Sequence, residues 1–425
     1  MPFQTISVIG LGYIGLPTAA VIASRKIHVI GIDINQHAVD TINRGEIHIV
    51  EPDLDSIVRA VVTTGHLRAS TKPEPADAFV IAVPTPFKDH HEPDLKFIEA
   101  ACASIAPVLK PGNLVILEST SPVGATEKLA DWLAAARPDL SFPQHAGTAS
   151  DIRIAYCPER VLPGKVLHEL IENDRVIGGM TEKCSQAAVA LYKTFVQGEC
   201  FVTNARTAEM CKLTENSFRD VNIAFANELS LVCSRLGIDV WELIRLANRH
   251  PRVNILQPGP GVGGHCIAVD PWFIVDSAPE EARLIRTARE VNDYKPQWVI
   301  ERVQLAVAAY LQANPKQTAR DVVIACFGLA FKPDIDDLRE SPSLAITATL
   351  ASAHPGVVLA VEPNVETLPA SLEGKNVRLE SMFGAVKKAH IIVGLVAHRP
   401  FKELDVDTLG EKSVVDACGV WRHNS

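Results

Sequence analysis

The sequence contains no long run of lysine and arginine, although it is 425 residues long and carries a formal net charge of -9. It therefore lacks the electrostatic signature of a protein that binds nucleic acid or an anionic membrane surface. Its longest apolar runs, such as residues 322–331, fall well short of the roughly 18 residues that indicate a membrane span. No basic segment precedes the first apolar stretch, which we expect to be a strand and not a signal peptide. A small-molecule partner is expected, with no nucleic acid and no membrane.

Cysteine pairs at metal-binding spacing are also missing. The nine cysteines are an odd number, they are scattered, and no two of them form a C-x-x-C pair. This pattern argues against a disulfide framework and against structural zinc. We therefore expect no metal and a reducing, cytoplasmic environment. The length, with 47% hydrophobic and 21% charged residues, predicts two or three globular domains.

The sequence does contain an alternation of short apolar runs with amphipathic segments, which is the βαβ pattern of a parallel sheet. In the first half these runs cover residues 5–10, 28–33, 78–84, 113–119 and 152–158. Residues 205–236 predict one long helix, and residues 280–311 predict another that Pro296 interrupts. Strand-like runs return at residues 322–328, 357–363, 391–397 and 413–417.

The predicted fold class is therefore α/β, with two Rossmann-like parallel-sheet domains joined by a helical middle domain that contains a long central helix. The predicted boundaries are 1–200 for a dinucleotide-binding domain, 201–312 for the helical domain and 313–425 for the second, smaller α/β domain.

A dinucleotide-binding fingerprint opens the chain. Gly10, Gly12 and Gly15 form G-x-G-x-x-G between a predicted strand and a predicted helix, where glycines permit a tight turn and close approach of a pyrophosphate. The phosphates are expected at the N-terminus of that helix. Asp33 ends the second strand, where an acid accepts hydrogen bonds from the ribose and disfavours a 2'-phosphate. These residues predict NAD as the cofactor.

A single cysteine, Cys266, lies in the glycine-rich stretch GPGVGGHCIAVDP at residues 259–271. A free cysteine is most often buried and inert, but the surrounding glycines let the backbone approach a ligand closely, which favours a nucleophile. Asp270 is expected to cap the helix that begins at Pro271. Both interpretations of the thiol stay open on the sequence alone.

Other candidate residues each have a plain alternative. One face of the long helix carries Lys212, Asn216 and Asp220. These side chains could belong to a functional site, or they could form a polar stripe exposed to solvent. Glu159 follows a predicted strand, where open α/β sheets bind ligands, although it could also be a surface carboxylate. Two cationic residues, Lys332 and Arg339, follow a predicted strand near the C-terminus. They could bind a phosphate group, or neighbouring aspartates could balance their charges.

Together these motifs resemble the nucleotide-sugar dehydrogenase family, whose members oxidise the 6-hydroxyl of a UDP-hexose to a carboxylate with two NAD. The likeness covers essentially the whole chain. It is carried in order by GLGYIGLP, VPTP, ESTSPVG, CPER, EMCKLTEN, GPGVGGHCIAVDP and FKPDIDDLRESP.

The resemblance implies roles for individual residues. It makes Cys266 the nucleophile, with Lys212 and Asn216 as oxyanion stabilisers, and it gives the handling of water or protons to Glu159, Asp270 and Thr120. The cofactor-binding set that it implies is Gly10, Gly12, Tyr13, Ile14, Gly15, Asp33, Pro84, Thr85 and Thr120. The substrate-binding set is Glu159, Arg160, Val161, Lys212, Asn216, Arg252, Gly263, His265, Lys332 and Arg339. It also implies a homodimer formed through the helical middle domain.

The substrate expected from the resemblance is a UDP-sugar. His265 and Val269 stand where the UDP-glucose enzymes carry serine and lysine, which favours the branch that acts on UDP-N-acetylhexosamines in bacterial surface polysaccharide synthesis, with the manno epimer expected. UDP-N-acetylglucosamine and UDP-glucose are the alternative substrates. Two rival functions are a two-electron hydroxy-acid dehydrogenase and a nucleotide sensor without turnover.

Overall fold

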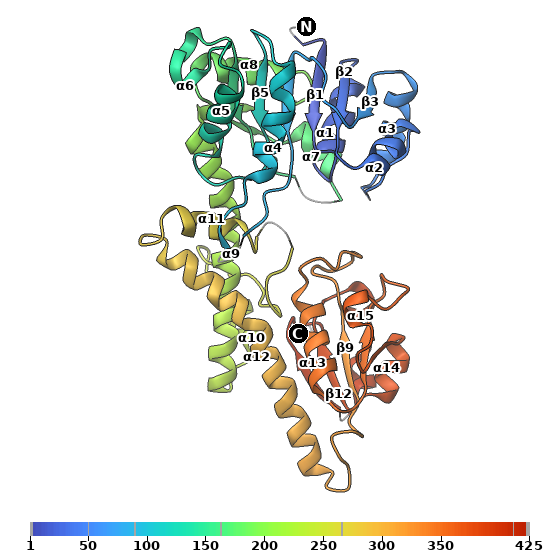
Figure 1. Cartoon of the computed structure of the whole chain (residues 1–425). Helices are drawn as coiled ribbons and strands as arrows, with labels where there is room; N and C mark the ends of the chain where they lie inside the picture. The colour runs from blue at the N-terminus through green and yellow to red at the C-terminus, as the bar shows by residue number, and fades with distance from the viewer. Residues whose placement is uncertain are drawn as a thin grey trace. The chain divides into compact units, whose positions relative to one another are not determined.

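The computed structural model describes residues 3–49, 51–88, 91–161, 164–264, 267–410 and 412–421. These residues form two compact units (Figure 1). The first unit comprises Met1–Glu215 and Trp272–Pro279, and the second comprises Asn216–Pro271 and Glu280–Ser425.

The first unit is built on an eight-stranded sheet with the order β3-β2-β1-β4-β5-β6-β7-β8. Its strands are β1 Thr5–Ile9, β2 His28–Ile32, β3 Leu67–Ser70, β4 Ala78–Ile81, β5 Leu114–Leu117, β6 Arg153–Tyr156, β7 Arg175–Gly179 and β8 Cys200–Asn204. The five strands predicted from apolar runs are confirmed, and β3, β7 and β8 were not predicted. Neighbouring strands are parallel except β6 and β7, which are antiparallel.

Helices cover both faces of this sheet, which explains why β4 and β5 are fully apolar and buried. One face packs against α1 Gly15–Ser24, α2 Gln36–Asn43, α3 Leu54–Thr63, α7 Val166–Glu172 and α8 Glu182–Tyr192. The other packs against α4 Lys96–Ile105, α5 Ala125–Ala136 and the first turn of α9 Ala205–Leu236. The order of strands reverses between β1 and β4, so the carboxyl ends of these two strands flank the switch point where open α/β sheets bind ligands.

The second unit contains a five-stranded parallel sheet with the order β11-β10-β9-β12-β13. Its strands are β9 Ile324–Phe327, β10 Val358–Val361, β11 Val377–Leu379, β12 Ile391–Gly394 and β13 Ser413–Asp416. One face packs against α12 Arg283–Ala313 and α13 Pro342–Ala353, and the other against α14 Met382–Lys388 and α15 Arg399–Lys402. The remaining helices are α6 Pro143–Ala146, α10 Val240–Ala247, α11 Asp270–Ser277, and the 3-10 helices η2 Ala106–Val108, η3 Gly147–Ala149, η4 Ala370–Leu372 and η5 Val406–Leu409.

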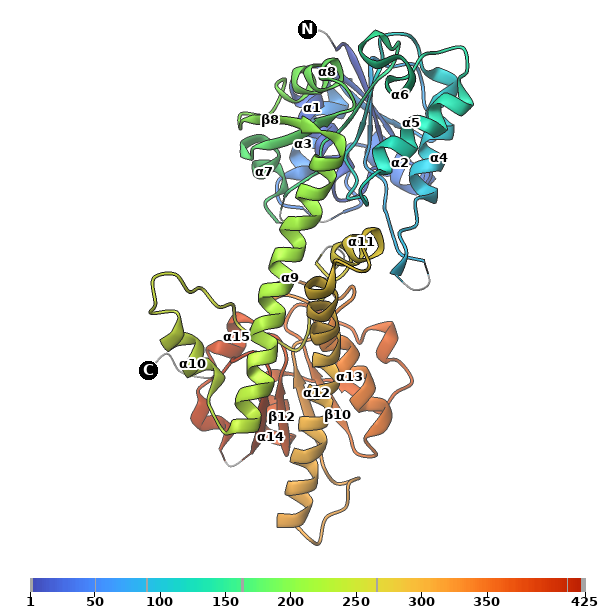
Figure 2. The ribbon, with the colours of Figure 1, turned by 90° about the vertical axis from the view of Figure 1, so that its left-hand side faces the viewer.

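The central part of the sequence forms two long helices, α9 and α12, which are labelled in Figure 2. The prediction for α9 is confirmed, but the prediction that Pro296 interrupts α12 is wrong, because the helix continues through it. A proline inside a helix removes one backbone hydrogen bond and costs about 3 kcal/mol. Burial of the apolar side chains that follow it in the core of the second unit, Val299, Ile300 and Val303, offsets that cost. In the described part of the chain, no helix is long and apolar enough to cross a membrane.

Candidate functional site

The glycine fingerprint forms a turn between β1 and α1. A side chain at Gly15 would place its Cβ 1.8 Å from the carbonyl oxygen of Gly10, so only glycine permits this approach of helix to strand. The backbone N–H of Gly10 donates to the carbonyl of Ile32 at 2.8 Å, which ties the turn to the end of β2. The turn therefore lies at the carboxyl edge of the sheet, beside the switch point.

The N-terminus of α1 suits the pyrophosphate of NAD. Apart from Gly12 itself and its two chain neighbours, no described residue has a heavy atom within 4 Å of where a Cβ of residue 12 would lie, which leaves room for a ligand against the backbone. The helix has no side-chain cap at Ile14 and no acidic residue in its first turn. The dipole of the helix therefore favours an anion at this end. Tyr13, beside this turn, is 42% exposed.

Asp33 directly follows β2, where the residue that binds the ribose is expected. One of its carboxylate oxygens accepts the N–H of Leu11 at 2.9 Å, and the other accepts the N–H of Asn35 at 2.9 Å. Asp33 thus fixes the glycine turn while it remains partly exposed. Each carboxylate oxygen can accept further hydrogen bonds. This geometry fits a role toward the ribose and places a negative charge where a 2'-phosphate would lie.

Two threonines predicted to bind the cofactor follow neighbouring strands at the same edge. Thr85 follows β4, next to the exposed Pro84, and its buried hydroxyl has no hydrogen-bond partner among the residues that the structure describes. Thr120 follows β5 in a loop that Ser119 holds by donating to the carbonyl of Val83 at 2.6 Å. A buried hydroxyl usually bonds a ligand or an ordered water, so Thr85 fits the predicted cofactor role.

Glu159 follows β6 and is buried at 6% exposure, so it is not a surface carboxylate. One carboxylate oxygen accepts from Arg175 at 2.6 Å, and the other accepts the N–H of Arg160 at 2.6 Å. Burial disfavours the charged form of Arg175, yet the carboxylate of Glu159 holds the pKa of this guanidinium above its usual value. The side chain of Arg160 forms an ion pair with Glu215 at 2.7 Å, and Val161 beside it is half-buried.

Two residues that shape this edge of the sheet were not predicted from the sequence. Arg175 opens β7, and nothing in the local pattern of that strand distinguishes it from a surface arginine. Glu209 lies in the EMCKLTEN motif, and its carboxylate accepts the N–H groups of Gly124 and Thr126 at 2.6 and 2.8 Å. Burial raises the pKa of Glu209, against the effect of these hydrogen bonds. Its motif was a signal that could have identified it.

In the second unit, Asn216 and Asp270 are brought together. The amide of Asn216 donates to the carboxylate of Asp270 at 2.5 Å, and both side chains are buried. Helix α11 begins at Asp270 itself. Asp220, one turn beyond Asn216, pairs with Arg289 at 2.7 Å and is fully buried, so this part of α9 is not a solvated stripe.

The glycine-rich loop packs against the loop at residues 331–342. A Cβ at Gly263 would lie 2.6 Å from the carbonyl oxygen of Glu340 and 2.9 Å from the Cβ of Phe331, so the two backbones touch only because this residue is glycine. The backbone N–H of Gly259 donates to Asn227 of α9 at 2.9 Å. The predicted nucleophile Cys266 and its neighbour His265 lie outside the described residues.

The cations predicted to bind the substrate are exposed. Lys332 and Arg339 lie in the loop that contacts Gly263, and the guanidinium of Arg339 bonds Asp337 at 2.6 Å, as the balanced-charge alternative proposed. Arg252 is exposed in the loop after α10, whereas Lys212 is half-buried on α9 in the first unit. The predicted site residues are therefore divided between the two units. The cofactor residues and Glu159 belong to the first, and Asn216, Asp270 and Gly263 belong to the second.

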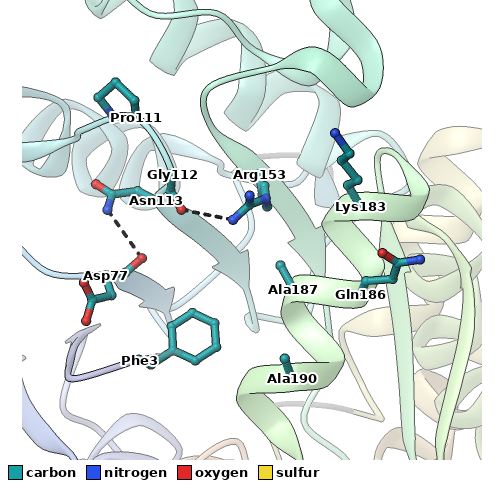
Figure 3. Close-up of a pocket in the computed structure, with 10 residues that line it drawn as sticks. All are labelled: Phe3, Asp77, Pro111, Gly112, Asn113, Arg153, Lys183, Gln186, Ala187 and Ala190. Carbon is teal, nitrogen blue, oxygen red and sulfur yellow. Dashed lines mark hydrogen bonds between the residues drawn. The ribbon is translucent and has the colours of Figure 1, made fainter. Parts of the chain in front are cut away.

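A hollow of about 610 Å³ in the first unit lies at the other edge of the sheet (Figure 3). Its lining residues Asp77 and Asn113 precede β4 and β5, and Arg153 opens β6. Asn113 donates to the carbonyl of Ala76 at 2.8 Å and Arg153 donates to the carbonyl of Gly112 at 3.2 Å, so these groups are bonded to the surrounding backbone. The described lining contains none of the predicted site residues, and the candidate site remains at the carboxyl edge.

A doubly wound sheet, a glycine turn against a helix N-terminus and an acid at the end of β2 define a protein that binds NAD. Three models of the UDP-glucose/GDP-mannose dehydrogenase family match the chain: the NAD binding domain over residues 4–196, the central domain over residues 206–294 and the UDP binding domain over residues 325–423. The chain belongs to this family.

Individual relatives are similar over almost their full length. The chain is 69% identical over 422 residues to a UDP-N-acetyl-D-mannosamine dehydrogenase of Yersinia pestis, covering 99% of this chain and 100% of that protein. It is 66% identical over 419 residues to an NDP-N-acetyl-D-galactosaminuronic acid dehydrogenase of Ralstonia nicotianae, covering 99% and 96%. Among solved structures, a UDP-D-ManNAc dehydrogenase from Pyrococcus horikoshii matches with a TM-score of 0.85 at 38% identity, covering 98% and 96%.

Proposed function

We propose that this chain oxidises the 6-hydroxyl of UDP-N-acetyl-D-mannosamine to a carboxylate in two NAD-dependent steps. The observation that carries this proposal is its 69% identity, over the full length, to a protein with that substrate in its name. We also propose that residues 1–200 bind NAD, that residues 201–312 carry the catalytic loop, and that residues 313–425 bind the UDP group. The match of residues 325–423 to a UDP binding domain supports the last assignment.

The first oxidation gives an aldehyde, which can lose a second hydride only after a nucleophile adds to its carbonyl carbon, and we propose that the thiol of Cys266 is this nucleophile. Each NAD that the glycine turn and Asp33 hold would accept one hydride, so two NAD molecules bind in succession for the two oxidations. Attack of Cys266 on the aldehyde carbon creates a thiohemiacetal, whose oxidation leaves a thioester that water cleaves to the acid and the free thiol. A free cysteine has a pKa near 8.5, so a neighbouring cation or base is needed to raise the thiolate fraction at neutral pH.

The other catalytic residues are proposed to act on charge and water. Lys212 and Asn216 stabilise the oxyanion of the tetrahedral species, and Asp270 orients Asn216 through the 2.5 Å hydrogen bond. Thr120 and Glu159 prepare the attacking water, with Glu159 as the first choice for the base. Support for Glu159 is its position after β6, at the edge of the sheet where the cofactor residues lie.

A second candidate substrate is an N-acetyl-D-galactosamine derivative. The 66% identity to the Ralstonia nicotianae protein favours it almost as strongly as the first. Both names contain an N-acetylated hexosamine, so the 2-acetamido group is common to the two proposals and only the stereochemistry of the sugar differs. The product, a nucleotide-linked sugar acid, suits the synthesis of bacterial surface polysaccharide of the enterobacterial common antigen type. We place the reaction in the cytoplasm, where the thiol stays reduced.

A panel of UDP-sugars tests this function. With each sugar limiting, we expect two NADH per UDP-N-acetylmannosamine and slower turnover of the N-acetylgalactosamine, N-acetylglucosamine and glucose analogues. A pocket that bonds the acetamido group rejects glucose, because each buried polar group left unpaired costs roughly 1 to 3 kcal/mol. One NADH per sugar would instead support a two-electron dehydrogenase. Faster turnover of UDP-glucose would contradict the N-acetylhexosamine assignment, and preference for another epimer would contradict only the stereochemistry.

We also propose that the protein is a homodimer formed through α9. Phe218, Phe225 and Val232 follow one another at seven-residue spacing, which places them on one face of the helix. They are 69%, 52% and 46% exposed, although large apolar side chains in a stripe usually pack against a partner. A second copy of the same helix presents an equally apolar face, which is how a two-fold symmetric interface forms.

Phe225→Glu should convert the dimer into a monomer, because it places a charge in the centre of this face. Sedimentation velocity at several protein concentrations measures the change. Phe383→Glu is the matched control, since Phe383 is 70% exposed on α14 and outside the proposed face. A monomeric wild type, or a Phe225→Glu variant that sediments like Phe383→Glu, would rule out this interface.

A further inference from the structure

Four buried side chains of the first unit form a polar cluster, which we call the Glu118 cluster. It consists of Glu118, Glu159, Arg175 and Tyr192, and each is at most 6% exposed. Glu118 directly follows β5 and Glu159 follows β6, and these are adjacent parallel strands in register. The two acids therefore leave the sheet close together, at the edge where the cofactor and Thr120 are proposed to lie.

The cluster contains one cation, and that cation bonds Glu159. Arg175 donates to the carboxylate of Glu159 at 2.6 Å and to the carbonyl of Leu170 at 3.0 Å. Glu118 instead accepts from the hydroxyl of Tyr192 at 3.0 Å. Its second oxygen is buried beside the hydroxyl of Thr18, which favours the ionised acid but makes no hydrogen bond of good geometry with it. A carboxyl group without a bonded cation in such a place favours its neutral form.

The groups around Glu118 identify it as the member that changes charge near neutral pH. Burial, reinforced by the charge of Glu159, raises the pKa of Glu118 to about 7, whereas Arg175, Tyr192 and Thr18 act in the opposite direction. Burial also raises the pKa of the Cys157 thiol to about 12 and raises that of Tyr192, so both stay neutral. The single positive charge of Arg175 can fully balance only one of the two acids.

We propose that Glu118 is a positioning residue for Glu159, acting through the shared cation Arg175. When Glu118 is protonated, the guanidinium is left to Glu159 and fixes its carboxylate. When Glu118 loses its proton, two buried carboxylates compete for one guanidinium, and Glu159 is held less firmly. This inference rests on the proposed function, in which Glu159 prepares the water that releases the sugar acid. The rate of acid release therefore falls as the pH rises through the ionisation of Glu118.

Glu118→Gln tests the proposal, because glutamine keeps the shape and the hydrogen bond but cannot ionise. We expect the ratio of wild-type kcat to Glu118→Gln kcat to fall at least about threefold between about pH 6 and about pH 8.5. Tyr192→Phe removes a donor that favours the ionised acid, so its inflection should move to higher pH. Asp151→Asn is the matched control. Asp151 accepts a hydrogen bond from Ser141 and lies just before β6, at the end of the strand opposite to Glu159.

Two kinetic results would overturn the proposal: a wild-type profile that coincides with that of Glu118→Gln, or a loss in Glu118→Gln that is uniform in pH. The melting temperature gives a readout that needs no substrate. Because the pKa of Glu118 is raised in the folded protein, its contribution to stability is complete below its usual pKa and is lost as the pH rises through about 7.

The Tm of the wild type should therefore fall relative to that of Glu118→Gln over this interval, and a constant difference also overturns the proposal. Absence of turnover of every UDP-sugar would refute the proposed function, while the Tm comparison would still decide whether Glu118 ionises. A changing Tm difference with coincident kcat profiles would show ionisation without a positioning role, which overturns the inference.

Discussion

Cys266→Ser is expected to reduce formation of the sugar acid at least about a thousandfold, while the protein stays folded and binds NAD. Serine nearly preserves the volume of the side chain. Its hydroxyl is far less acidic than a thiol, however, and an ester formed on it would be a poorer acyl group for water to cleave than the thioester. Acid formed per sugar, NADH released and NAD binding are the quantities to measure.

Cys200→Ser is the matched control for this variant. Cys200 lies on β8, half-buried, and burial raises the pKa of its thiol. A cysteine of this kind is unreactive, so its replacement should leave acid formation within about twofold of the wild type. If Cys266→Ser and Cys200→Ser were equally active, Cys266 would be an inert thiol and the thioester route would be wrong.

Arg175→Leu is expected to lower the free energy of unfolding by about 3 to 5 kcal/mol. The side chains of Arg175 and Glu159 are 1% and 5% exposed, so removing the guanidinium leaves a carboxylate buried without its cation. Urea unfolding followed by circular dichroism measures the loss. Adding Glu159→Gln to the variant removes the stranded charge and should restore part of the stability.

Arg206→Leu is the matched control for Arg175→Leu. Arg206 pairs with Glu127 at 2.8 Å, but the two side chains are 60% and 46% exposed. Exposed ion pairs contribute at most about 1 kcal/mol, because water solvates both charges when the pair is broken. A loss in Arg175→Leu no larger than in Arg206→Leu would show that the buried pair does not hold this edge of the sheet together.

Several features were predictable because they depend on local sequence. The apolar runs that became β1, β2, β4, β5 and β6 are short, end at turns and alternate with helical segments, so their spacing alone predicted a doubly wound sheet. The glycine turn followed from the steric freedom of glycine, and the place of Asp33 followed from the end of the next strand. Helix α9 was predictable because it contains neither glycine nor proline over its whole length.

Strands β3 and β7 escaped prediction for a physical reason. LRAS in β3 alternates exposed and buried residues over only four positions, and RVIGG in β7 contains two glycines that are depleted in strands. Strand β3 is stabilised by pairing with β2, and β7 is stabilised by pairing with β6 and β8. These pairs join residues that are distant in the sequence. The effect of Pro296 could not be predicted for the same reason, because packing of α12 against the core of the second unit keeps the helix continuous.

By itself, the sequence determined the fold class, the cofactor turn and the motifs that place the chain in its family, because each of these depends on residue types at short spacing. Only the tertiary structure decided how the acids are used. It pairs Glu159 with Arg175, leaves Glu118 with the neutral Tyr192, and buries Asp220 against Arg289. These partners come from different strands and helices, and the charge state of a buried acid depends on which partner the fold brings within bonding distance.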